Sequence, residues 1–117
     1  MVVELARAAF EELVDLALDG IPDELAELVR NVVVLVEDDA PADDPYLLGL
    51  YDGVALTERE ANDAARLPDR ILLFRRPLLA ACDTLHQLED EVRITVVHEI
   101  AHHFGIDDAR LHDLGYA

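Results

Sequence analysis

The strongest constraint on the fold is the segment from Thr84 to Gly105, which carries the start and stop signals of one long helix. Thr84 and Gln87 have the spacing of a capping box, in which each residue satisfies a free backbone N–H at the helix start. Glycine suits the left-handed conformation that ends many helices. Apolar side chains recur on one face at helical spacing: Leu85, Leu88, Val92, Val96 and Ile100, widened by Val97, Ala101 and Phe104. We therefore predict one amphipathic helix over residues 84–104.

Shorter helices are expected on both sides of this segment. The stripe of Ala6, Phe10, Leu13 and Ala17 predicts a helix over residues 3–18 that stops near Gly20. Proline favours the first turn of a helix, so Pro22 predicts a second helix through residue 29. A last short helix is expected over residues 108–114, capped by Asp107 and ended by Gly115.

Strand signals lie between these helices. The run Val32–Val36 is continuously apolar and β-branched, which is typical of a strand buried on both faces. Residues 71–74 form a second clear strand, and residues 47–56 read as an edge strand with a turn or bulge at Asp52 and Gly53. Loops are predicted over residues 37–45 and 57–69, and a helical turn over 78–82. The pattern predicts an α+β fold with a small mixed sheet of three to four strands, packed on the N-terminal and the long helix.

Length and charge narrow the choice of function. The 117 residues suit a single domain, residues 1–117. All nine basic residues are arginines, and 26 acidic residues bring the net charge to −17, which argues against nucleic acid or an anionic membrane as a partner. With 52% hydrophobic residues the chain can still fill a core. It shows neither a secretory signal nor a membrane-spanning apolar run, so a cytoplasmic location is expected.

Several reactive residue types are interpreted as structural. Cys82 is the single cysteine, which excludes an internal disulfide and a zinc site built on cysteine pairs, and we expect it to be a buried apolar side chain. His86 is expected on the surface. Tyr46, Tyr51 and Tyr116 are expected to pack in the core or on the surface, although each could donate a hydrogen bond to a reaction oxyanion.

The end of the long helix carries the chemistry. His98, Glu99 and His102 form a His-Glu-x-x-His sequence. Residues four apart share one face of a helix, so the two imidazoles can chelate one metal ion. Glu99 is rotated by about 100°, roughly one helical position, and can reach a metal-bound water as a general base.

A third ligand can be sought after the helix. Gly105 lets the chain turn back, and Asp108, three residues further on, can then approach the same ion. No Glu follows Glu99, which excludes a downstream glutamate as the ligand. Asp108 fits the spacing best, and the remaining candidates are His103, Asp107, His112 and Asp113. Asp107 is interpreted as a helix cap. His103 is interpreted as an exposed side chain or as one whose hydrogen bonds are satisfied in the core. His112 is interpreted as a residue that contacts one of the metal ligands.

Residues 97–115, VHEIAHHFGIDDARLHDLG, resemble the active segment of the zincin metallopeptidases. The His-Glu-x-x-His-x-x-Gly-x-x-Asp form is similar to the metzincin signature, with Asp108 where most metzincins have a third histidine. Together with LLGLYDGVALTER and LPDRILLFRRP, the segment resembles a bacterial family of very small zincin-like metallopeptidases. The resemblance implies a zincin-like sheet with an edge strand over the active helix. It also implies His98, His102 and Asp108 as zinc ligands, with Glu99 as the base.

Two departures from the larger zincins bear on activity. Met1 is the single methionine, so a Met-turn below the metal is missing. Only residues 106–117 follow Gly105, where larger zincins build the lower wall of the cleft. A second copy of the chain could supply that wall in a homo-oligomer.

These observations favour a zinc-dependent peptidase that uses one Zn²⁺ ion and acts on a peptide or protein substrate. The peptide would bind extended along a sheet edge at residues 47–51 or 71–74. The alternative is a non-catalytic metal-binding domain whose acidic surface holds a basic protein, which a closed site recruiting His112 would favour. A metallohydrolase acting on another substrate class is a third hypothesis.

Overall fold

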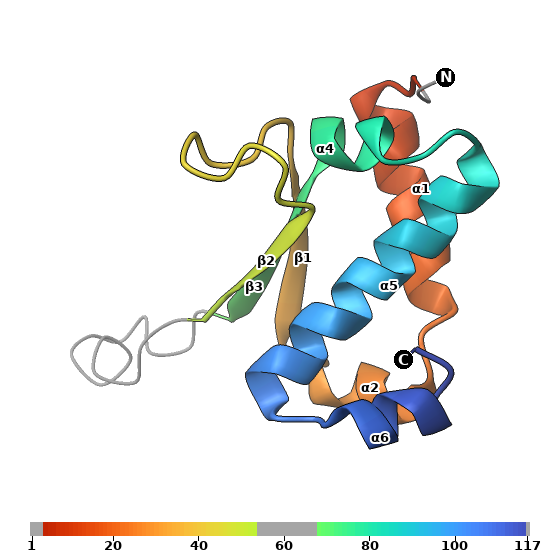
Figure 1. The fold of residues 1–117 in the computed structure, drawn as a ribbon, viewed down its shortest axis with the longest axis vertical. Helices are drawn as coiled ribbons and strands as arrows, with labels where there is room; N and C mark the ends of the chain where they lie inside the picture. The colour runs from red at the N-terminus through yellow and green to blue at the C-terminus, as the bar shows by residue number, and fades with distance from the viewer. Residues whose placement is uncertain (1–3, 54–67, 117) are drawn as a thin grey trace.

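The computed structural model describes residues 4–53 and 68–116 and has the predicted α+β architecture (Figure 1). Three strands form one sheet, and the long helix α5 crosses one face of it. The elements in chain order are α1 Arg7–Asp19, α2 Asp23–Leu28, β1 Val32–Glu37, β2 Gly49–Asp52, β3 Asp69–Phe74, α4 Arg75–Ala80, α5 Leu85–Phe104 and α6 Asp108–Asp113.

The sheet has the order β1-β3-β2, with β3 in the centre. β1 runs parallel to β3, and β2 runs antiparallel to it. The prediction of an edge strand near residues 47–56 is confirmed by β2, while residues 54–56 lie outside the described part of the chain. The prediction that residues 71–74 could form a free, substrate-binding edge is wrong, because β3 is paired on both sides.

The prediction that Val32–Val36 is buried on both faces is also wrong. β1 is an edge strand, and Val33 and Leu35 are 39% and 38% exposed. Helices α1 and α5 lie on the other face of the sheet (Figure 1). Leu35, Leu72 and Leu50 are in register across the three strands, on the face turned away from these helices.

The hydrophobic core fills the space between the sheet and the helices. Its largest fully buried side chains include Phe10 from α1, Leu25 from α2, Ile71 and Leu73 from β3, and Leu88 and Ile100 from α5. The apolar face predicted for the long helix is confirmed except at its ends, where Leu85 is 53% and Phe104 is 41% exposed. On α1 the buried stripe contains Val14 rather than Ala6, which precedes the helix.

The ends of α5 follow the sequence signals. The Thr84 hydroxyl accepts a hydrogen bond from the backbone N–H of Gln87 at 3.1 Å, and the Gln87 side chain accepts one from the backbone N–H of Asp83. Gly105 is left-handed with φ 69°, and the N–H of Ile106 bonds back to the carbonyl of Ala101 at 2.9 Å. Both predicted ends are therefore confirmed.

The structure corrects the boundaries of other predicted segments. Helix α1 begins at Arg7 rather than near residue 3, and the helical turn expected at 78–82 is the earlier helix α4. The predicted loop 57–69 lies outside the described residues, apart from Pro68 and Asp69. No helix within the described ranges has the length and apolar character needed to cross a membrane.

A polar cluster fastens the N-terminus and α4 to the end of β1. The Arg75 Nε donates to Asp38 Oδ1 at 2.8 Å, and another nitrogen of the same guanidinium donates to the Leu5 carbonyl at 2.8 Å. The hydrogen bond from Arg75 holds the pKa of the Asp38 carboxyl below its ordinary value, and the charge of Arg7 adds to this effect.

Candidate functional site

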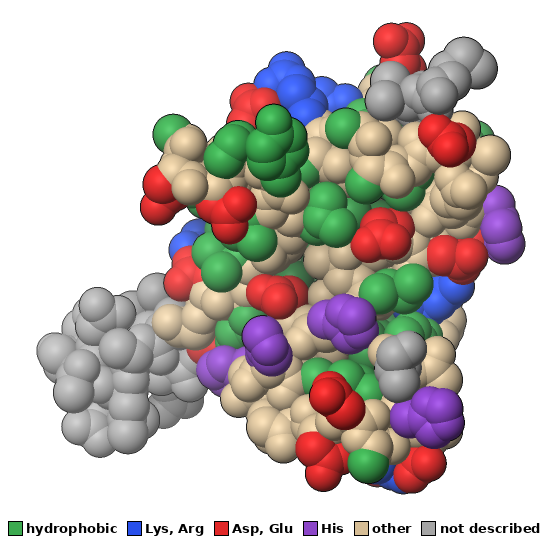
Figure 2. Space-filling model, viewed as in Figure 1, with side chains coloured by type: hydrophobic (Ala, Val, Ile, Leu, Met, Phe, Trp, Pro, Cys, Tyr) green, Lys and Arg blue, Asp and Glu red, His purple; other side chains and the backbone are tan. Residues whose placement is uncertain are grey.

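The two histidines of the motif lie in the last two turns of α5. His98 and His102 are four residues apart on one continuous helix, and both side chains are exposed. Their imidazoles therefore share one face of the helix, as two ligands to one ion require. Figure 2 shows that histidine side chains gather over the C-terminal half of α5 and over α6, with carboxylates among them.

Glu99 faces the sheet edge. Its Oε1 atom accepts a hydrogen bond from the backbone N–H of Tyr51 on β2 at 2.9 Å, and its side chain is part-buried. The outward N–H of an edge strand has no partner within its sheet, so the carboxylate satisfies a donor that the sheet leaves open. One carboxylate oxygen of Glu99 is thus fixed, and Oε2 is left for another partner.

A glycine allows this close approach between β2 and α5. A Cβ added at Gly49 would lie 2.7 Å from the Thr95 Cγ2 on α5 and 3.1 Å from the Leu72 carbonyl oxygen. Any larger residue would have to push the strand away from the helix. Gly49 therefore sets the spacing that brings Tyr51 within reach of Glu99.

Tyr51 is held from three further directions. Its ring stacks on His103 with a centroid distance of 3.8 Å and an interplanar angle of 12°, and Phe104 meets it edge-on at 6.2 Å. Its hydroxyl donates to Asp69 Oδ2 at 2.8 Å, and the His103 Nε2 lies 3.9 Å from the same oxygen. His103 is exposed, which is one of the two alternatives predicted for it. Its ring also packs on Tyr51, the residue of β2 whose backbone N–H contacts Glu99.

The carboxyl-terminal segment reaches back to His98. The Nε2 of His98 lies 3.1 Å from the backbone carbonyl oxygen of Tyr116, within hydrogen-bond distance. The N–H of Tyr116 bonds to the Leu111 carbonyl at 2.8 Å, which holds this segment against α6. A ligand role for the Nε2 of His98 would require the Tyr116 carbonyl to move away.

The candidates for a third ligand lie on and around α6. Asp107 caps this helix through a hydrogen bond from the Arg110 N–H at 2.8 Å, as predicted. Asp108, His112 and Asp113 are exposed on α6. Within residues 4–53 and 68–116, no three or more His, Cys, Asp or Glu side chains are grouped closely enough to hold a metal ion. The role of Asp108 stays a prediction.

The donor set nevertheless fits zinc. Two exposed imidazoles on one helix face, with a carboxylate in the next position, supply the nitrogen and oxygen donors that zinc prefers. The Tyr116 carbonyl already beside His98 shows that a polar oxygen can approach this imidazole from outside the helix.

The remaining candidates of the sequence have structural roles. Burial raises the pKa of the Cys82 thiol, and its side chain belongs to the hydrophobic core, as predicted. His86 is exposed, 3.6 Å from Asp90, and Tyr46 is 87% exposed. The importance of Tyr51 and Asp69 could not be read from sequence, because only the pairing of β2 with β3 brings them together.

Comparison with known proteins shows the family and the fold of the chain. Residues 29–116 match the sequence model of the family described as zincin-like metallopeptidase. The chain belongs to this family. A conserved hypothetical protein from Thermo thermophilus has a similar fold, with a TM-score of 0.57 and 24% identity over 86% of this chain and 94% of its own. No match was found among curated proteins.

Proposed function

We propose that the chain is a zinc-dependent peptidase in which His98, His102 and Asp108 hold the ion and Glu99 is the general base. The observation that carries the proposal is the position of Glu99. It follows the first of two histidines on one helix face, and the edge strand β2 holds its Oε1 atom at 2.9 Å. Membership of the zincin-like metallopeptidase family supports the same chemistry.

Each side chain has a distinct task in this proposal. Bound zinc would lower the pKa of a coordinated water towards about 7 and polarise the substrate carbonyl. Glu99 takes the proton of the attacking water on Oε2, because Oε1 is already engaged by the Tyr51 N–H. It then delivers that proton to the leaving nitrogen. The hydrogen bond from Tyr51 orients the carboxylate and keeps Oε2 turned away from the sheet.

The substrate would lie along β2. This strand is a sheet edge directly beside α5, so an extended peptide could pair with its outward backbone groups other than the Tyr51 N–H, which Glu99 holds. The net charge of −17 favours substrates with basic residues over acidic ones. A second copy of the chain could complete the lower wall, and a strictly monomeric active protein would contradict that part of the proposal.

The decisive test compares Glu99→Gln with the parent protein and with Glu89→Gln, a matched change on the same helix. Zinc content is measured by elemental analysis, and hydrolysis with a quenched fluorescent peptide library. We expect all three proteins to bind one zinc ion and only Glu99→Gln to lose hydrolysis by at least about a hundredfold. Hydrolysis unchanged in Glu99→Gln would refute the role of Glu99. Zinc binding without hydrolysis by the parent would favour the non-catalytic metal-binding alternative.

A further inference from the structure

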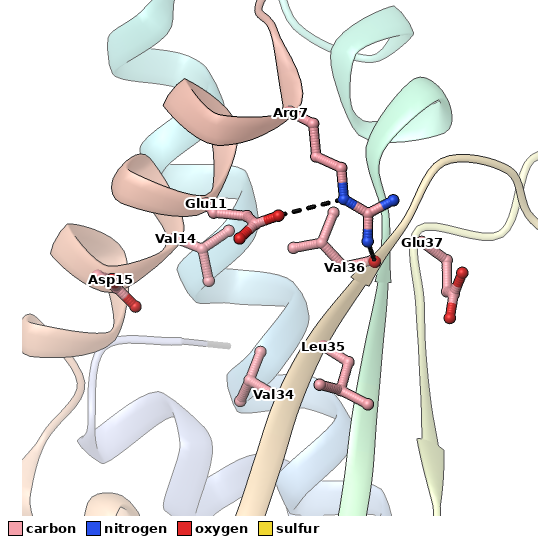
Figure 3. Close-up of a pocket in the computed structure, with 8 residues that line it drawn as sticks. All are labelled: Arg7, Glu11, Val14, Asp15, Val34, Leu35, Val36 and Glu37. Atoms are coloured by element: carbon pink, nitrogen blue, oxygen red, sulfur yellow. Dashed lines mark hydrogen bonds and ion pairs between the residues drawn. The ribbon is translucent and has the colours of Figure 1, made fainter.

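A groove lies at the opposite edge of the sheet from β2, between α1 and β1. It encloses about 280 Å³ and is lined by Arg7, Glu11 and Asp15 on α1 and by Val34 and Val36 on β1, among others. Figure 3 shows the Arg7 side chain reaching the edge of β1, with Glu11 beside it. The groove therefore has carboxylates along one wall and a valine strand along the other.

The wall formed by β1 exposes unpaired backbone groups. Among the strands of the described residues, β1 pairs only with β3, so its other edge is open. The Val36 carbonyl points towards this edge, because it accepts a hydrogen bond from the Arg7 side chain. Backbone groups of alternate residues in a strand point the same way, so the N–H and carbonyl of Val34 face the groove as well.

The contacts of Arg7 show that the edge of β1 can hold a guanidinium. Its guanidinium bonds both to the Val36 carbonyl and to Glu11 Oε1, the latter at 3.1 Å (Figure 3). A guanidinium is thus held between a backbone acceptor of β1 and a carboxylate of α1. This arrangement exists within the chain itself, at one end of the groove.

Two further residues, Asp15 and Val34, line the groove one step beyond Glu11 and Val36. Asp15 follows Glu11 by one helical turn, about 6 Å along α1, and Val34 precedes Val36 by two strand residues, about 6.6 Å. Because α1 and β1 run in opposite directions (Figure 1), Asp15 and Val34 lie towards the same end of the groove. In the described part of the chain, no side chain forms an ion pair or hydrogen bond with Asp15.

We propose that this groove binds an extended, arginine-bearing segment of a partner protein as an added strand on β1. The segment's backbone pairs with the open N–H and carbonyl of Val34, since Arg7 holds the Val36 carbonyl, and an arginine side chain of the segment pairs with the Asp15 carboxylate. Its apolar side chains pack on the valines of β1. The interaction is independent of the proposed peptidase activity, since β1 and β2 are opposite edges of the sheet.

The test uses the peptide Ac-Val-Arg-Val-Arg-Val-NH2, titrated into the full chain by NMR. Two variants lose the same two charges: Glu11→Gln with Asp15→Asn inside the groove, and Glu12→Gln with Asp43→Asn outside it. The two residues changed in the control variant, Glu12 and Asp43, are exposed and do not line the groove. The two variants have the same net charge. A difference between their affinities for the peptide therefore reports binding in the groove rather than general attraction to an acidic surface.

We expect the amide signals of Val34 and Val36 to shift on titration. We also expect the groove variant to bind about five- to tenfold more weakly than the control variant, as for two part-exposed charge contacts. The all-D peptide should bind more weakly than the L-peptide, because it cannot match the twist of β1. Equal affinities of the two variants, or shifts confined to β2 and α5, would overturn the proposal.

Discussion

Replacing Gly49 with alanine tests whether the close approach of β2 to α5 fixes the site. The new Cβ would lie 2.7 Å from the Thr95 Cγ2, whereas two methyl carbons prefer at least about 3.5 Å. Relief requires a displacement of about 1 Å between strand and helix. The Tyr51 N–H to Glu99 distance, now 2.9 Å, would grow to about 4 Å and leave hydrogen-bond range.

Overpacking of this kind costs about 1–3 kcal/mol. For a chain of this length that corresponds to a fall in Tm of about 4–15 °C. Circular dichroism gives the Tm, and hydrogen exchange at the Tyr51 amide reports its bond to Glu99. We expect Gly49→Ala to lower the Tm and to speed exchange at Tyr51.

Two further variants test whether the contact between residue 49 and Thr95 is the cause. Gly53→Ala is the matched control, because its Cβ would lie 3.4 Å from the edge of the exposed His103 ring, an ordinary contact. Thr95→Ser removes the clashing methyl, so it should restore most of the stability of Gly49→Ala when the two are combined. A Tm for Gly49→Ala equal to that of Gly53→Ala, or no recovery with Thr95→Ser, would show that the contact does not set the strand position.

Three more outcomes follow from features of the fold. Asp38→Asn should lower the urea midpoint at pH 7 more than the exposed control Asp43→Asn. Because the folded pKa of Asp38 is lowered, this difference should persist down to the ordinary value of 3.8 and vanish as pH falls through the folded pKa. Cys82, the single thiol, should react with a thiol reagent only as fast as the core opens, and an immediate reaction in the native protein would contradict its burial. Zinc binding should shift the NMR signals of Tyr116, since its carbonyl now occupies the Nε2 of His98, and unchanged signals at full zinc occupancy would contradict ligation through that atom.

Local signals allowed the helices to be predicted well. The caps at Thr84, Gly105 and Asp107 depend on backbone groups no more than about five residues away, so sequence spacing suffices to identify them. The same spacing places His98 and His102 on one face. Predicting that the two imidazoles are neighbours on α5 therefore requires no information from the rest of the chain.

The sheet could not be predicted to the same depth. A continuous β-branched run such as Val32–Val36 suggests burial on both faces, yet strand order decides burial, and β1 lies at an edge with helices on one side. The hydrogen bond of Glu99 to Tyr51 and the role of Gly49 both depend on the register of β2 with β3. No residue pattern within either segment encodes that register.

The 48-residue separation between Tyr51 and Glu99 has a consequence for folding. Both imidazoles come from neighbouring turns of one helix and are available as soon as α5 forms. The carboxylate is oriented only after the sheet has assembled and docked, a non-local step that is slower than helix formation. If the proposed roles of His98, His102 and Glu99 hold, a half-folded chain would present metal-binding imidazoles without an oriented base, so that partly folded copies could take up an ion without being able to cut one another.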